Sequence, residues 1–343
     1  MTRSRVVVSV AAALVALGLA AGLGVLVLSP ARAAVGPLPA EALALPADAR
    51  FLMGVDVKRL VASPLYARFA KGPGGMRPDA FKVLEERTGI DPERDVRELI
   101  VAGGLGGRNE GVALVLGDFD QYQIGRAIET GKKGATWKKL GGTTVYVFSE
   151  GKGTPSALSF LDGHGIVLGS AAGVESTVES RAEGRAALKG NAVLVDLLSG
   201  VKPGSTFWMV GDQSLLANMP TSIPGPGSSA GSSANITLPK LTSLTVTGDL
   251  DPVLSVDVVG AATDAAAASN LADVVRGFVA LAALQASQKP ELKALQTAIS
   301  VATDQSRVRL TARFPHDLIE ALARPKAPSP APPEPAPDPS RLR

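Results

Sequence analysis

The strongest catalytic motif in the sequence is a G-x-S-x-G pattern at Gly227-Ser228-Ser229-Ala230-Gly231. Asp257 or Asp304, followed by His316, completes the chain order nucleophile, acid and histidine that α/β-hydrolases use. A nucleophile elbow, however, needs a strand directly before the serine and a helix directly after it. Both flanks here are rich in Gly, Pro, Ser and Ala, so the sequence predicts a loop without a hydrolase site.

The two histidines are placed for structural roles. His164 stands in Asp162-Gly163-His164-Gly165, a sequence typical of a tight turn between strands. His316 follows Phe314-Pro315 at an expected helix start, where its ring is predicted to be exposed. Neither position favours a general base or a metal ligand.

Two D-x-D triplets, Asp118-Phe119-Asp120 and Asp249-Leu250-Asp251, have the spacing at which two carboxylates can share a divalent cation. The first lies between a strand and a helix, and the second in a hairpin turn, so helix capping and turn formation explain both. Glu85 and Glu86 are neighbours on a helix expected over 79–88, where successive side chains point about 100° apart. They are expected to be solvated, not paired as acid and base.

The glycine-rich segment from Gly103 to Gly111 lacks both the P-loop pattern and the G-x-G-x-x-G pattern that opens a helix. Because it joins two apolar runs, we predict a hairpin turn and not a phosphate site. Asn235-Ile236-Thr237 has the pattern of a glycosylation acceptor, which matters only in a host that glycosylates exported proteins.

One basic cluster contains an aromatic residue. Lys132, Lys133, Lys138 and Lys139 surround Trp137, a combination that can contact anionic lipid headgroups or an anionic polymer. The alternative is a solvated loop between a helix and a strand, and this is the structure we predict.

Composition narrows the possible functions further. The chain has 343 residues, no cysteine and two histidines, and 35 Lys and Arg against 32 Asp and Glu leave a net charge of +3. The absence of cysteine excludes disulfides, thiolate metal sites and thiol catalysis. The small net charge provides no concentrated positive field for binding nucleic acid. We therefore expect no catalytic residue, no cofactor-binding residue, no metal ligand, no cofactor and no nucleic-acid partner.

The first 33 residues have the features of an export signal. Arg3 and Arg5 precede an uncharged run from Val6 to Leu28, and small residues precede a possible cleavage after Ala33. The run is also long enough for a membrane-spanning helix, so a cleaved signal peptide and an N-terminal membrane anchor both remain open. Either way, the rest of the chain is expected in the periplasm or at the cell surface, after a linker over 34–45.

In the remaining chain, the same order of strands, hairpin and helix occurs twice. Strands expected over 51–57 and 206–212 are each followed by a hairpin, namely 99–102 with 112–116 and 244–247 with 253–258. A helix follows each hairpin, one capped by Asp120 and one by Thr263 or Asp264. The next strands are expected over 144–148, 157–161 and 166–169 in the first half, and over 299–303 and 308–313 in the second.

Helices expected over 173–181 and 315–323 close the two halves. We therefore predict an α+β fold of two similar halves, 46–185 and 186–324, each an antiparallel sheet with helices packed on one face. A Gly/Ser-rich segment at 220–235 is expected to be a mobile loop, and the Pro-rich tail at 325–343 to be disordered.

Three motifs in the first half carry a resemblance. They are Leu45-Pro46-Ala47-Asp48-Ala49-Arg50-Phe51, Ser63-Pro64-Leu65-Tyr66 and Gly89-Ile90-Asp91-Pro92-Glu93-Arg94-Asp95. Their order resembles a group of uncharacterised exported bacterial proteins, specifically over about residues 45–120. The resemblance implies export and no particular activity, and Asp91-Pro92 is also explained as a helix cap before proline.

These observations predict an exported cell-envelope protein without a catalytic site that acts as a binding or assembly module. The partner would be another envelope protein, held through the sheets or the groove between the halves. The alternative is a periplasmic carrier of an apolar ligand, and a hydrolase with a site not visible in the sequence is a further possibility. If residues 6–28 stay uncleaved, they add a membrane contact.

Overall fold

A computed structural model gives the arrangement of residues 38–71, 85–86, 89–106, 110–131, 135–149, 153–216, 222–224, 235–237, 239–285 and 297–323. The expected export signal, most of the Gly/Ser-rich segment and the Pro-rich tail lie outside these residues. Among the described helices, none is long and apolar enough to cross a membrane.

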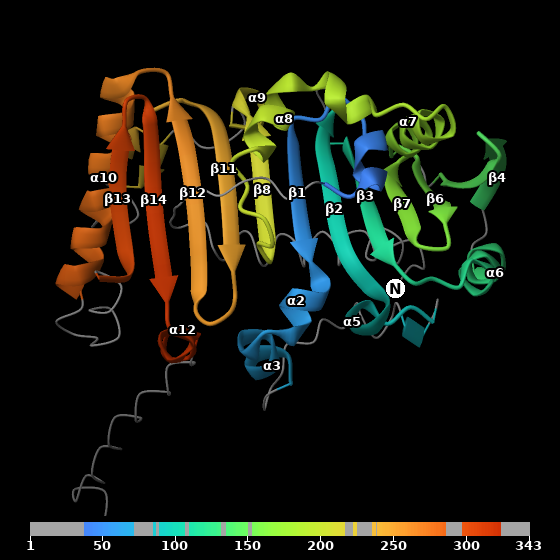
Figure 1. Cartoon of the computed structure of the whole chain (residues 1–343), viewed down its shortest axis with the longest axis horizontal. Helices are drawn as coiled ribbons and strands as arrows, with labels where there is room; N and C mark the ends of the chain where they lie inside the picture. The colour runs from blue at the N-terminus through green and yellow to red at the C-terminus, as the bar shows by residue number, and fades with distance from the viewer. Residues whose placement is uncertain are drawn as a thin grey trace, which may run out of the picture.

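One antiparallel sheet of 12 strands organises the molecule (Figure 1). Its order is β13-β14-β12-β11-β8-β1-β2-β3-β7-β6-β5-β4. The strands are β1 (Phe51–Asp56), β2 (Val96–Leu105), β3 (Glu110–Gly117), β4 (Ala135–Leu140), β5 (Thr143–Phe148), β6 (Ser156–Asp162), β7 (Gly165–Ser170), β8 (Phe207–Asp212), β11 (Leu241–Asp249), β12 (Leu254–Ala262), β13 (Ile299–Asp304) and β14 (Arg307–Phe314). Two short strands, β9 (Ser222–Pro224) and β10 (Asn235–Thr237), pair separately.

The strand order confirms an α+β fold of two similar halves. Reading outward from the centre, the first half runs β1-β2-β3-β7-β6 and the second runs β8-β11-β12-β14-β13. The first half then adds β5 and β4 at its edge. The halves do not form separate sheets, because β1 and β8 pair with each other and join them into one. The boundaries at 46–185 and 186–324 remain predictions.

The two central strands share the pattern F-x-M-x-x-D. Its positions are Phe51, Met53 and Asp56 in β1 and Phe207, Met209 and Asp212 in β8. Met53 lies directly opposite Met209 in the sheet. Because each methionine therefore faces its own equivalent, an approximate two-fold axis passes through the sheet at this pair.

Helices connect or flank these strands. They are α2 (Val57–Ala62), α3 (Pro64–Lys71), α5 (Pro92–Asp95), α6 (Gln121–Gly131), α7 (Ala171–Ala182), α8 (Ala192–Leu198), α9 (Gln213–Leu216), α10 (Ala265–Gln285) and α12 (His316–Ala323), with 3-10 turns η1 (Ala40–Ala44) and η2 (Ala187–Gly190). Asp120 accepts a hydrogen bond from the backbone N–H of Gln123 at the start of α6, and Asp264 accepts one from Ala267 at the start of α10. Both predicted caps are confirmed.

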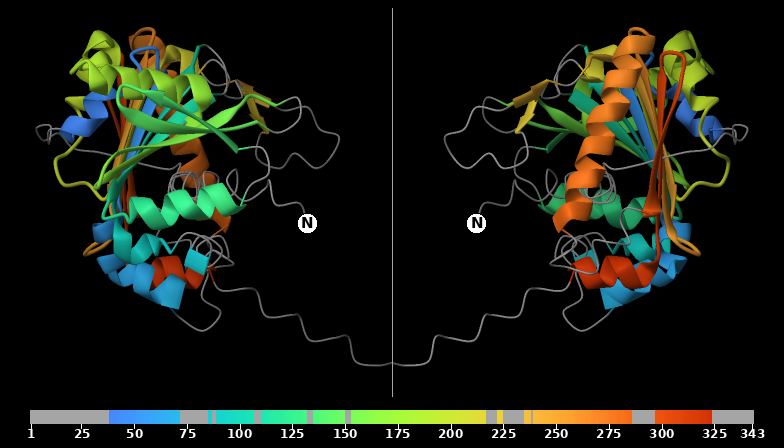
Figure 2. Two further views of the ribbon diagram at one scale, coloured as in Figure 1. Left: turned by 90° about the vertical axis from the view of Figure 1, so that its right-hand side faces the viewer. Right: turned by 90° about the vertical axis from the view of Figure 1, so that its left-hand side faces the viewer.

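Helices cover the two faces of the sheet unequally. The face toward the viewer in Figure 1, here the front face, carries η1, α7, η2 and α8 over the first half and the centre. Its core includes Leu52, Val174 and Leu194. On the opposite rear face, α6 and α10 stand at the two ends of the sheet (Figure 2).

Several elements were not predicted from the sequence. The short strands β9 and β10 form at the two ends of the segment expected to be a mobile loop over 220–235. The segment around Trp137, expected to be a solvated loop, forms the edge strand β4. Helix α8 precedes β8, and Asn191 caps it by accepting a hydrogen bond from the N–H of Leu194. The predicted hairpins, by contrast, are confirmed as β2–β3 and β11–β12.

Candidate ligand-binding site

The residues singled out as a possible hydrolase triad do not form one. Asp257 lies half-buried within β12, and Asp304 ends β13 opposite Arg307. His316 is half-buried and not exposed as expected, with Nε2 2.7 Å from the carbonyl oxygen of Leu250. Ser228 and Ser229 lie outside the described residues, so the G-x-S-x-G pattern has no structural account.

The structure does bring one acid and one histidine together. His164 lies in the turn between β6 and β7, as predicted, with Nδ1 3.0 Å from Oδ1 of Asp118. Both side chains are open to solvent, with 69% and 84% of their surfaces exposed. The turn is held in place because its backbone carbonyls accept hydrogen bonds from Gly117 and Phe119. We assign this pair a structural role at the end of β3.

The D-x-D triplets serve folding as well. Asp120 caps α6, as described above. Asp249 is largely buried and accepts hydrogen bonds from Lys202 Nζ and from the backbone N–H of Thr206, both at 3.0 Å. Within the described residues, no three His, Asp or Glu side chains come close enough together to hold a metal ion.

The predicted basic cluster is dispersed over two faces of β4. Lys138 points to the front face and pairs with Glu175 of α7 at 2.7 Å, whereas Lys139 donates to Thr144 Oγ1 at 2.9 Å. Lys132 and Lys133 lie outside the described residues. Trp137 stays 64% exposed and lies directly opposite Tyr146 in the β4–β5 pair. The cluster is therefore part of a strand that borders a pocket.

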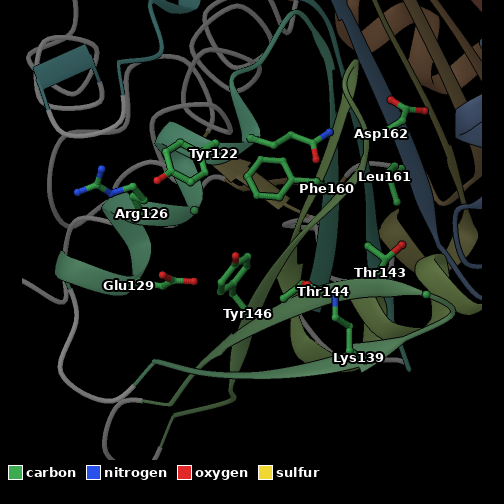
Figure 3. A pocket seen from close by; sticks show the side chains of 13 residues that line it. Tyr122, Arg126, Glu129, Lys139, Thr143, Thr144, Tyr146, Phe160, Leu161 and Asp162 are labelled. Atoms are coloured by element: carbon green, nitrogen blue, oxygen red, sulfur yellow. Dashed lines mark hydrogen bonds between the residues drawn. The ribbon is translucent and has the colours of Figure 1, made fainter.

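This pocket lies on the rear face between α6 and strands β4, β5 and β6, and we call it the α6 pocket (Figure 3). It is an open hollow with a volume of about 480 Å³, within the range of about 300–1,000 Å³ typical of small-molecule sites. Its lining residues are Gln121, Tyr122, Gly125, Arg126, Glu129, Lys139, Gly142, Thr143, Thr144, Tyr146, Phe160, Leu161 and Asp162.

Helix α6 contributes one wall through a stripe of side chains. Tyr122, Gly125, Arg126 and Glu129 are spaced by three or four residues and so project from one side of the helix. Ile124, on another side, is buried in the rear core and fixes the helix on the sheet. The Arg126 guanidinium lies 5.7 Å from the centre of the Tyr122 ring, a cation–π distance.

The sheet contributes the opposite wall. Tyr146 and Phe160 project from β5 and β6 onto the rear face, and their rings meet edge to face with centroids 6.5 Å apart. The Tyr146 hydroxyl points at α6, where a Cβ at Gly125 would lie 3.1 Å away. Burial, and then the nearby Glu129 carboxylate, raise the pKa of the Tyr146 phenol, so it remains a neutral donor at physiological pH.

A smaller hollow of about 160 Å³ lies where the two halves join. Asp56, Glu98, Lys202 and Trp208 are among the residues that border it. Burial, and then the carboxylate of Asp56 directly opposite, raise the pKa of Glu98 to about 6. The expected groove between the halves is therefore small and acidic on one side.

A groove between the halves was expected from the sequence, whereas the α6 pocket was not. The stripe at 122, 125, 126 and 129 was the available local signal, because its spacing marks one side of a helix. Apart from Gln121 of α6, the remaining wall residues come from β4, β5, β6 and the β4–β5 turn, whose positions depend on the order of the sheet.

Comparison with known proteins yields little. No family model matches the chain, and no curated protein matches it. Among solved structures, crystal forms IV and I of TP0453 align with TM-scores of 0.42 and 0.43 and with 11% and 8% sequence identity. Each alignment covers 84% of this chain and 97% of TP0453.

Proposed function

We propose that this chain is an exported, non-catalytic binding module of the cell envelope that holds a small polar ligand in the α6 pocket. The observation that carries the proposal is the lining of this pocket. It combines aromatic rings with hydroxyl, amide and charged groups, the mixture that orients a small organic ligand and gives specificity.

Export is supported by the sequence before the described residues. The two arginines before residues 6–28, and the small residues before position 34, fit a signal that directs the following chain across a membrane. The motif resemblance to exported bacterial proteins supports the same location, the periplasm or the cell surface. Anchoring through residues 6–28 is the form we propose if the signal is not cleaved.

The chemistry of the described side chains supports binding over catalysis. In the described part of the chain, neither His164 nor His316 is hydrogen-bonded to a serine, threonine or tyrosine hydroxyl. An Asp–His pair without a nucleophile, open to water on both side chains, lacks the arrangement of acyl transfer.

The nature of the pocket favours a polar ligand over the apolar carrier considered above. Arg126, Glu129, Lys139 and Asp162 all border it. An alkyl chain placed there would displace water from charged groups without replacing their hydrogen bonds, which is unfavourable.

Recovery of a bound ligand from native protein tests the proposal. The mature protein is purified gently from the envelope, and the co-purifying molecules are identified by mass spectrometry. Gly125→Leu provides the comparison, because its side chain would extend toward Tyr146 and fill the pocket. Gly277→Leu on α10 is the control, since a Cβ at Gly277 meets no atom within 4 Å.

A polar molecule present with wild type and Gly277→Leu but absent from folded Gly125→Leu is the expected result. A co-purifying lipid unaffected by Gly125→Leu would contradict the pocket and favour the apolar carrier. If the pure protein turned over a substrate, and Asp118→Asn or His164→Gln abolished that turnover, the non-catalytic assignment would be contradicted.

Placement has its own test. Cell fractionation is expected to find the protein outside the cytoplasm, with Ala34 as the first residue if the signal is cleaved. If the segment is an anchor, Met1 or Thr2 is found in the membrane pellet. A soluble cytoplasmic protein with an intact N-terminus would contradict export.

A further inference from the structure

We infer that the α6 pocket binds a neutral saccharide unit, so that the module recognises a glycan. This inference rests on the proposed function and names the ligand class for the same site. Three features carry it: the aromatic walls, the hydrogen-bonding groups between them and the balance of charge.

Aromatic side chains are concentrated at this site. The sequence contains 3 Tyr and 2 Trp, and of these Tyr122 and Tyr146 line the pocket while Trp137 stands beside it on β4. Tyr122 is 73% exposed although its ring is large and partly apolar. A pyranose ring presents C–H groups on its faces and hydroxyls at its edges, so it gains most from an aromatic surface with a polar rim.

Several polar groups are available to such hydroxyls. Within the part of the chain that the structure describes, the side chains of Gln121, Arg126 and Glu129 form no hydrogen bond or ion pair with one another or with other residues. Gln121 offers both donor and acceptor atoms, Arg126 offers donors and Glu129 offers acceptors. Sugar hydroxyls both donate and accept, and can therefore use all three.

The pocket is lined by charges of both signs. Arg126 and Lys139 oppose Glu129 and Asp162, and Asp162 is already engaged by Arg181 outside the pocket. A phosphate or a carboxylate ligand would meet Glu129, and a lone cation would meet Arg126. An uncharged ligand with many hydroxyl groups meets no like charge and can still form charge-assisted hydrogen bonds.

The wall formed by the sheet is held in place before a ligand arrives. Tyr146 is confined between the edge of Phe160 and Gly125 of α6, and Lys139 is fixed by Thr144. These side chains therefore lose little conformational freedom when a ligand binds. This favours affinity for a neutral ligand, which forms no ion pair with the protein.

Trp137 extends the site beyond one sugar unit. It is directly opposite Tyr146 across the β4–β5 pair, and directly opposite residues of an antiparallel pair share one face of the sheet. A second unit of a glycan can therefore lie over Trp137 while the first occupies the pocket. We expect disaccharides to bind more tightly than the matching monosaccharides.

Titration with defined sugars tests the inference. The mature protein is titrated with maltose, cellobiose and N,N′-diacetylchitobiose, each compared with its monosaccharide. Binding is followed by intrinsic tryptophan fluorescence and by ligand-observed saturation-transfer NMR. We expect at least one disaccharide to bind, and Tyr122→Ala to weaken that binding about tenfold or more. Thr130→Val, on α6 outside the pocket lining, is the matched control with unchanged affinity.

Charge variants separate a sugar from a charged ligand of the same size. Glu129→Gln and Arg126→Gln keep hydrogen-bonding atoms but remove the charge, so saccharide affinity should fall less than in Tyr122→Ala and should depend little on salt. The dipeptide Ala-Ala serves as a zwitterionic probe and is expected not to bind. Binding of Ala-Ala with no saccharide binding, or no binding of any of these sugars by folded protein, would overturn the inference.

These outcomes are distinguishable from failure of the proposed function. If a polar molecule other than a sugar is recovered from the native protein and lost in Gly125→Leu, the binding module stands and only the saccharide assignment fails. If Tyr122→Ala leaves sugar binding unchanged, the sugars bind elsewhere, and the assignment of this pocket is wrong.

Discussion

The environment of Glu98 makes the free energy of unfolding depend on pH. Its pKa rises from 4.5 to about 6 in the folded protein, because burial and the facing Asp56 disfavour the carboxylate. The folded state thus holds the proton more tightly than the unfolded state. The resulting stability is present below about pH 4.5 and is lost as the pH rises through about 6.

Glu98→Gln removes this penalty at neutral pH. Because the side chain is partly open to solvent, we expect a gain of about 1 kcal/mol in the free energy of unfolding at pH 7. Urea unfolding at pH 7 and at pH 4 measures it, and the gain should disappear at pH 4. An equal gain at both pH values would point to packing and not to charge.

Asn191 connects the two halves through two hydrogen bonds and caps a helix through a third. Its Oδ1 caps α8, and its Nδ2 donates to the carbonyls of Ala47 and Ala49 at 2.8 and 2.9 Å. Asn191→Ala should lower the free energy of unfolding by about 2–3 kcal/mol, because a cap and two further bonds are lost. Asn191→Asp keeps the cap and loses both donors, so chemical denaturation should place it between wild type and alanine.

At the scale of elements, each half packs a phenylalanine over a glycine of the neighbouring strand. The ring of Phe51 covers Gly103, and the ring of Phe207 covers Gly248. A Cβ at either glycine would lie 2.3 or 2.1 Å from the ring Cζ atom. Glycine is therefore required at both positions, and the repeated contact supports the internal duplication independently of strand order.

Substitution tests these equivalent contacts. Gly103→Ala and Gly248→Ala should each lower the free energy of unfolding by about 1–3 kcal/mol through overpacking, as measured by thermal or urea unfolding. Phe207→Leu should partly rescue Gly248→Ala, because it removes the ring that the methyl group meets.

Gly277→Ala on α10 is the matched control and should be neutral or stabilising by up to about 1 kcal/mol, since its position is open. Tolerance of alanine at Gly248 but not at Gly103 would show that the two contacts are not equivalent.

At the scale of the whole molecule, the continuous sheet predicts cooperative unfolding. β1 and β8 pair from Phe51–Gly211 to Val55–Phe207, and the front core contains residues of both halves, including Leu52 and Leu194. Neither half can unfold without exposing the other's central strand and core.

The two tryptophans provide the test. In Trp137→Phe, fluorescence reports Trp208 near the centre of the sheet, whereas far-UV circular dichroism reports all elements. We expect the two urea midpoints to coincide. If the Trp208 fluorescence and the circular dichroism changed at different urea concentrations, the halves would unfold independently.

Local sequence was sufficient for most elements. Tight hairpins are predicted by Gly248 to Pro252 and by the glycines after Ala102, and helix starts by Asp120 and Asp264. These predictions succeed because turns and caps depend on residues within a few positions of one another. β4 was not predicted, since Trp137-Lys138-Lys139 at an exposed edge has no apolar alternation.

What the sequence by itself determined was therefore the order of strands and helices, their repetition and the expectation of export. Only the tertiary structure decided that β1 pairs with β8, and that α6 lies over β4, β5 and β6 to bring Tyr122, Tyr146 and Phe160 to one pocket. Turn and cap energies are local. The pairing of β1 with β8, about 150 residues apart in the chain, and the walls of a pocket depend on how all apolar faces are buried together.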